Sequence, residues 1–308
     1  SGETASCVTR QAGSPGKPLG LGFFGERRSA KEGELSASKV FRIGGTLGHP
    51  NSLGAYIAGV LPVMMAMCLA TVPKRLRMLA MAACAGGSVA LVLSFSRSAW
   101  VAAALCFVLL VAWLLADRAR RNRVLPIALI SVVICLALGA FAPLIKARWT
   151  DDDNGSTVSR FSQFRVTGEM IRAHPWLGVG LNHYTSAVHL HETYVTDNKR
   201  GMVYLMEGRV HNVLLMTAAE SGIPILVWLG WFLGTIAWTG WRSIGRSRDE
   251  LVRFALMGML LGLFARILHD TFHTGNLALN PYLWVFTAIL AASPRIVAAE
   301  RAPSEAPV

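Results

Sequence analysis

Charged residues are scarce in this sequence. Only 16% of its 308 residues are Asp, Glu, Lys or Arg, 53% are hydrophobic, and the mean hydropathy is +0.44. Because a soluble globular domain carries about 25% charged residues, this composition excludes that class of protein. Acidic residues are the scarcer kind, and 18 of them against 30 Lys and Arg give a formal net charge of +12. In a soluble protein such a charge would suggest a nucleic-acid partner, but in so apolar a chain the first question is where the basic residues fall.

Features of several other protein classes are missing as well. Of the five cysteines only Cys7 lies outside the apolar runs, so no disulfide framework or CxxC site is readable. There is no internal repeat, and GSPGKP at 13–18 lacks the spacing of a phosphate-binding loop. Residues 1–40 are polar, rich in Gly and Ser, and begin without Met or a signal peptide. We therefore expect a flexible periplasmic segment there, and a chain that is the C-terminal part of a longer polytopic protein.

Long apolar runs are what the sequence does contain. A helix needs about 20 apolar residues to cross ~30 Å of hydrocarbon. We therefore predict an all-α fold, a polytopic transmembrane helical bundle of about seven spans. The runs that approach or exceed the required length are 52–71, 77–95, 98–116, 124–145, 212–240, 254–268 and 277–292.

One long connection, residues 146–211, separates the fourth and fifth runs. It begins with the turn-like DDDNGS, continues into a predicted helix over 158–173, and that helix stops at His174-Pro175. GVGLNHY at 178–184 then predicts a tight turn, and a second short helix is expected within 185–209. After the last run, 294–308 is predicted to be a solvated cytoplasmic tail.

The basic residues mark one side of the predicted bundle. If the spans alternate in direction, the short connections on one side hold eleven Lys and Arg, whereas those on the other side hold Arg97, with Arg266 at the end of a span. By the positive-inside rule the first side is cytoplasmic, so the long connection 146–211 faces outward. The eleven are Lys74, Arg75, Arg77, Arg118, Arg120, Arg121, Arg123, Arg242, Arg246, Arg248 and Arg253.

Two arginines on the outer side have no carboxylate nearby in sequence. Arg97 lies between two spans, where it is either a functional cation or an interfacial residue that snorkels to the headgroups. In the helix predicted over 158–173, Arg165 and Glu169 are spaced to pair. Arg160 lies instead on an apolar stripe, where it suits either a phosphate at the membrane surface or a structural pair with a distant carboxylate.

His211 follows the long connection and opens the fifth apolar run. An unperturbed pKa near 6.5 suits a general base, although a lone interfacial histidine is also a common cap or anchor. Asn212 could orient a substrate. Glu220, about half a turn out of phase with His211, is expected to tether helices or to meet an Arg within the bundle, and Gly222 to permit close packing.

Two sequence patterns, one of histidines and one of aspartates, could indicate a metal-binding site. In ARILHDTFHTGN, Arg266 and Asp270 are four residues apart, as are His269 and His273. The second spacing can bind zinc, but without a third ligand an ion pair between Arg266 and Asp270 is the favoured interpretation. The DDD at 151–153 resembles a metal–nucleotide-sugar site, but in a turn on the outer side a solvated loop is favoured.

Four stretches together resemble the O-antigen ligase and O-antigen polymerase family of bacterial inner-membrane proteins. The match covers about 41–292, and the family order and loop lengths are kept. The stretches also contain Arg42, His49 and Tyr184, which with Asn212 are candidates for substrate binding. The four stretches are RIGGTLGHPNSLGAY at 42–56, SFSRSAW at 94–100, RFSQFRVTGEMIRAHPWLGVGLNHY at 160–184 and HNVLLMTAAESG at 211–222.

The resemblance implies a GT-C-like membrane glycosyltransferase without a metal or other cofactor. Such an enzyme takes a glycan from undecaprenyl pyrophosphate on the periplasmic side and joins it to a hydroxyl of lipid A core, a polysaccharide or a protein. By this resemblance Arg97 and Arg160 would bind the pyrophosphate and His211 would activate the acceptor. The membrane domain would span 41–293, in the bacterial inner membrane and with no nucleic-acid partner. The alternatives are a transporter or flippase of an anionic lipid or solute, and a non-catalytic scaffold.

Overall fold

The computed structural model describes residues 43–116, 156–190, 210–273 and 281–300, and every regular element within these ranges is helical. Six of the described helices are long and apolar enough to cross a membrane, which confirms the all-α, multi-pass membrane fold. The predicted span at 124–145 lies outside the described residues. The six are α1 (Pro50–Leu69), α2 (Lys74–Leu93), α3 (Arg97–Leu115), α11 (Ile223–Arg246), α12 (Glu250–Asp270) and α13 (Pro281–Ala299).

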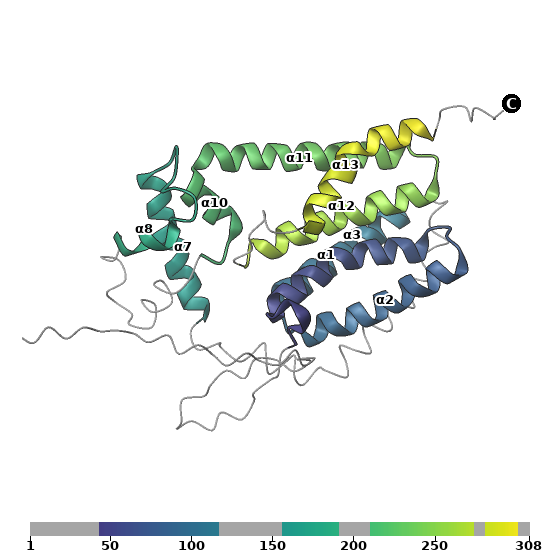
Figure 1. The fold of residues 1–308 in the computed structure, drawn as a ribbon, viewed down its shortest axis with the longest axis horizontal. Helices are drawn as coiled ribbons and strands as arrows, with labels where there is room; N and C mark the ends of the chain where they lie inside the picture. The colour runs from purple at the N-terminus through teal and green to yellow at the C-terminus, as the bar shows by residue number, and fades with distance from the viewer. Residues whose placement is uncertain (1–42, 117–155, 191–209, 274–280, 301–308) are drawn as a thin grey trace, which may run out of the picture.

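Helices α1 and α12 form the centre of the bundle. They pack against each other, α2 and α3 pack against α1, and α11 and α13 pack against α12 and each other (Figure 1). One continuous apolar core runs between these helices and includes Leu69, Leu110 and Phe254. At the end of the chain, α13 continues through Pro294 to Ala299, past the predicted start of the tail.

Glycines allow α1 and α12 to approach closely. A Cβ atom built on Gly262 of α12 would lie 2.2 Å from the carbonyl oxygen of Gly59 in α1, and one on Gly258 would lie 2.7 Å from the Cα of Val63. Neither position has room for a side chain unless the helices move apart. Small residues at such contacts are typical of membrane helix pairs, because packing rather than the hydrophobic effect holds the helices together.

Three shorter helices outside the six spans enclose a second, smaller core. They are α7 (Ser156–Ala173), α8 (Tyr184–Leu190) and α10 (Val213–Ser221). The predicted helix over 158–173, the short helix after 184 and the tight turn between them are therefore confirmed. The turn has positive φ at Gly178, Gly180 and Asn182. The second core consists of Val166, Met170, Tyr184, Ala187, Val188, Val210 and Ala219.

The predicted single span over 212–240 is wrong, because the chain turns at Gly222. This glycine has φ +86° and separates α10 from α11. A Cβ atom at this position would lie 2.1 Å from the carbonyl oxygen of Trp176, so the predicted close packing at Gly222 is confirmed. His211 consequently opens a short helix of the second core, and Glu220 lies before the membrane span that begins at Ile223.

The two ends of the bundle differ in composition. At one, the basic end, α1, α11 and α13 finish and α2 and α12 begin, among Lys74, Arg75, Arg77, Arg242, Arg246, Arg248, Arg253 and Arg295. The basic residues of 117–123 lie outside the described part of the chain. At the opposite end, the histidine end, α1, α3, α11 and α13 begin and α12 finishes. Its name comes from His49, His211, His269 and His273, which lie there.

Candidate functional site

The four residues of the histidine end form one cluster around His273. The His273 ring centroid lies 5.4 Å from that of His269, 5.8 Å from that of His49 and 6.1 Å from that of His211. His269 is on the last turn of α12, and His49 caps the start of α1. Two predicted site residues, His49 and His211, are thus brought together by a third histidine that follows α12.

Burial keeps His273 neutral. It lowers the pKa of this imidazole from its ordinary value of 6.5 to about 3, and the positive charges that His269, His211, His49 and Arg266 can carry lower it further. A protonated His273 would therefore be both poorly solvated and repelled by its neighbours. At neutral pH the centre of the cluster is an uncharged ring that can donate one hydrogen bond and accept another.

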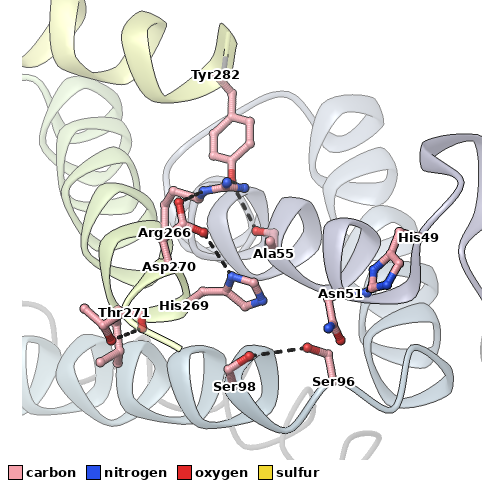
Figure 2. Close-up of polar contacts among 11 residues, drawn as sticks. His49, Asn51, Ala55, Ser96, Ser98, Arg266, His269, Asp270, Thr271 and Tyr282 are labelled. Carbon is pink, nitrogen blue, oxygen red and sulfur yellow. Dashed lines mark hydrogen bonds and ion pairs between the residues drawn. The ribbon is translucent and has the colours of Figure 1, made fainter. Parts of the chain in front are cut away.

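A chain of polar contacts supports the cluster from α12. Arg266 donates from Nε to Asp270 at 2.7 Å and from Nη1 to the Tyr282 hydroxyl at 3.1 Å, and that hydroxyl donates to the Ala55 carbonyl of α1 at 3.2 Å. The other Asp270 oxygen lies 3.2 Å from Nδ1 of His269. Figure 2 shows these side chains following one another from Tyr282 of α13 to His269. The predicted Arg266–Asp270 ion pair is confirmed, and both partners are buried.

The contacts of Asp270 also bear on the zinc alternative for His269 and His273. Both oxygens of this carboxylate are engaged, one by Arg266 and one by His269. Within the described ranges, no three His, Cys, Asp or Glu side chains are arranged to hold a metal ion. In the described structure His269 and His273 belong to the ring cluster. The DDD at 151–153 lies outside the described residues.

His211 is held by a hydrogen bond from the second core. Its Nδ1 lies 3.1 Å from Oε1 of Gln163, which is buried on α7. Because an amide oxygen only accepts hydrogen bonds, Nδ1 of His211 must carry the proton and donate it. Nε2 then has the lone pair that a general base requires.

Asn212 fixes the start of α10 next to His211. Its Oδ1 accepts hydrogen bonds from the backbone N–H groups of Leu214 and Leu215, at 2.9 and 3.0 Å. This is the N-cap arrangement, which satisfies donors that a helix otherwise leaves unpaired. The position of His211 is therefore set on one side by Gln163 and on the other by a capped helix.

Tyr184 and Glu220 join the helices of the second core. Tyr184 is buried, its hydroxyl is 2.7 Å from that of Thr167 in α7, and its backbone N–H donates to Glu220 Oε1 of α10 at 3.3 Å. Burial raises the pKa of the Tyr184 phenol. The expectation that Glu220 tethers helices is confirmed. Tyr184, predicted as a substrate-binding residue, packs the three helices against one another.

Of the predicted site arginines Arg97, Arg160 and Arg42, the structure places the side chain of Arg97 alone. Arg97 is half-buried and opens α3, where its neighbours Ser96 and Ala99 pack on Gly54 of α1. Arg160 belongs to α7, one turn before Gln163, but its side chain is outside the description. Arg42 also lies outside the described residues. The predicted pair Arg165–Glu169 is present, with 3.7 Å between Nε and Oε1.

The part that His269 and His273 play in the site is not evident from their spacing in the sequence. That spacing suggests only metal ligands or neighbours of an ion pair. A signal was nevertheless present, because all four histidines of the cluster adjoin span ends that alternation places on one side. What the sequence could not give is the close packing of α1 on α12, which brings these span ends together.

Comparison with known proteins gives one family match. Residues 80–230 match the family model for O-antigen ligase, Wzy_C, while no curated protein matches the chain. The matched range contains Arg97, Arg160 and His211, and it ends before α12. It covers both a part of the membrane bundle and the whole second core. Residues 80–230 are therefore similar to an O-antigen ligase domain, and this match supports a membrane enzyme of the O-antigen ligase and polymerase type.

Proposed function

We propose that this chain is a glycosyltransferase that joins an undecaprenyl-pyrophosphate-linked glycan to an acceptor hydroxyl on the periplasmic side of the bacterial inner membrane. His211 takes the proton of the acceptor hydroxyl, and the acceptor oxygen attacks the anomeric carbon of the first donor sugar. The bond between that carbon and the pyrophosphate oxygen breaks, and the pyrophosphate leaves with the electron pair. The acceptor is lipid A core, a polysaccharide or a protein side chain.

The observation that carries this proposal is the hydrogen bond between Gln163 and His211. It fixes the tautomer in which Nε2 of His211 is basic, and it joins α10 to the helix that contains Arg160. An oriented imidazole beside the neutral ring of His273 is suited to proton abstraction, and a positioned base typically contributes about 10²–10⁴-fold in rate.

Arg97 and Arg160 are proposed to bind the pyrophosphate and stabilise its charge as it leaves. A guanidinium presents planar paired donors that match phosphate oxygens, and charge stabilisation of this kind needs no metal ion. Arg97 opens α3 at the histidine end, and Arg160 lies one turn before Gln163 on α7. Arg42 and His49 are proposed to contact the donor from the segment that leads into α1.

The test is transfer by reconstituted protein from a lipid-linked glycan, with EDTA present and no energy source. His211→Ala is expected to lower transfer by about 10²–10⁴-fold, and Arg160→Ala to abolish it, while both variants insert and accumulate. The matched control is His183→Ala, which removes an exposed histidine from the turn before α8 and should leave transfer unchanged. Near-normal transfer by both site variants would refute the assignment.

The placement of charge argues against the transporter alternative. In each of the six described spans, every Asp, Glu, Lys and Arg lies within the first or last five residues. A transporter or flippase for an anion places ionisable residues near the middle of the membrane, often at broken helices. Glu220 precedes α11, and its carboxylate accepts a hydrogen bond from the backbone N–H of Tyr184. The charges of the described spans therefore lie near the membrane boundary, which is where the proposed transfer takes place.

A further inference from the structure

An apolar loop stands out on the surface of the second core. Residues 175–181, which we call the Trp176 loop, connect α7 to the turn before α8. Its three large side chains are among the most exposed of the described chain: Trp176 by 76%, Leu177 by 84% and Leu181 by 75%. The loop contains no Asp, Glu, Lys or Arg. Exposed apolar side chains clustered in this way mark an interaction surface.

Backbone hydrogen bonds fix the Trp176 loop to the start of a membrane span. The N–H of Ile223, the first residue of α11, donates to the Pro175 carbonyl at 2.8 Å. The N–H groups of Val179 and Gly180 donate to the carbonyls of Ala219 and Glu220 at 2.8 and 3.0 Å. The loop is therefore held at the level where the chain enters the membrane.

The start of α11, to which the loop is bonded, has an exposed apolar face of its own. This helix buries few of its residues within the described protein, and its outward face carries Ile223, Val227, Trp228 and Trp231, exposed by 44–66%. On a spanning helix such a face contacts lipid. Gly222, whose missing Cβ lets Trp176 approach, joins this lipid-facing surface to the loop.

We propose that the Trp176 loop inserts into the boundary between the headgroups and the acyl chains of the leaflet at the histidine end. Tryptophan is enriched at this depth because its ring is apolar while its N–H can contact water or headgroups. The anchored loop sets the height of the second core above the bilayer. Because α7 ends at this loop and carries Gln163, the anchor also sets the height at which His211 is held. The occupant is bilayer lipid, and the inference stands independently of the chemistry proposed above.

The experiment measures the depth of a nitroxide label on Leu177→Cys in vesicles of phosphatidylethanolamine and phosphatidylglycerol. The full chain is used, with its native cysteines replaced. Accessibility to oxygen, which concentrates in lipid, is compared with accessibility to a water-soluble nickel chelate. Two matched positions calibrate the scale. They are Val227→Cys on the lipid-facing side of α11 and Ser186→Cys, an exposed residue of α8.

The ratio of oxygen to nickel accessibility at Leu177 is expected to shift away from that of Ser186 and towards that of Val227, without any glycan donor. Leu177→Cys/Trp176→Ser should move the ratio back towards that of Ser186, because the main anchor is lost. A Leu177 label as accessible to nickel as the Ser186 label overturns the proposal. So does a label that becomes protected only when lipid-linked donor is added, since the loop would then bind the donor's polyprenyl chain.

Discussion

His273 is the residue through which the cluster at the histidine end is connected. Its ring contacts His49 from the start of α1, His211 from the second core and His269 from α12. The four rings can pack in this way only while His273 is neutral, because a positive charge on it would face four other potential cations. Protonation of His273 should therefore oppose the folded packing of the cluster.

The sign of the resulting pH dependence follows from the lowered pKa. His273 titrates near 6.5 when unfolded and near 3 when folded, so the unfolded state binds more protons between these values. Stability contributed by neutral His273 is fully present above pH 6.5 and is lost as the pH falls below it, by up to about 1.4 kcal/mol per pH unit. In His273→Gln the decline of the unfolding temperature on acidification should be shallower than in the wild type.

Thermal unfolding in detergent micelles across this pH range measures the effect. The quantity compared is the slope of unfolding temperature against pH, so an overall destabilisation of His273→Gln does not disturb the test. His183→Gln, which replaces an exposed histidine, should keep the wild-type slope. Parallel curves for wild type and His273→Gln would show that His273 does not resist protonation in the folded protein.

At the scale of elements, the contact between α1 and α12 places the cluster. The same two helices carry His49 at the beginning of one and His269 at the end of the other. Their separation is set by glycines, since the carbonyl oxygen of Gly59 lies where a Cβ of Gly262 would be. Widening this contact would move the two histidines apart as well as weaken the bundle.

Gly262→Ala is expected to destabilise the protein by about 1–3 kcal/mol, the usual cost of forcing extra volume into a packed contact. Gly234→Ala on α11 is the matched control, because nothing lies within 4 Å of its Cβ position. There the higher helix propensity of alanine should leave stability unchanged or raise it by up to about 1 kcal/mol. The measurement is the unfolding temperature of each variant, which should fall in Gly262→Ala and not in Gly234→Ala. Equal stability of both would contradict the close approach of α1 and α12.

The helices that can be predicted from the sequence are determined by local apolar length, whereas the break at Gly222 is determined by a contact with a distant residue. Apolar length alone located α1, α2, α3, α12 and α13, because a bilayer demands about 20 apolar residues per helix. The break between α10 and α11 was missed because both helices are apolar, so hydropathy continues across Gly222. What stops α10 is the positive φ of this glycine and the Trp176 carbonyl packed against it. That contact joins residues far apart in sequence.

At the scale of the whole molecule, the sequence predicts that Arg97 and His211 lie at the same end of the bundle, but not which residues surround His211. Charge distribution and alternation placed Arg97 and His211 on the same side, and in the described structure α3 and α11 both begin at the histidine end. The partners of His211 were not predictable. Gln163 and His273 reach it from α7 and from the end of α12, and only the packing of the second core on the bundle brings these segments together.

The two ends of the bundle suggest its orientation. Eight described Lys and Arg gather at the basic end, and from the positive-inside rule we propose that the histidine end faces the periplasm. In a Cys7→Ser background, a membrane-impermeant thiol reagent should label Thr185→Cys of α8 in intact spheroplasts and Gly245→Cys of α11 only after permeabilisation. Both positions are exposed, one on the second core and one at the basic end. Labelling of Gly245→Cys in sealed spheroplasts would place the basic end outside, and with it the histidine cluster on the side where a periplasmic donor cannot reach.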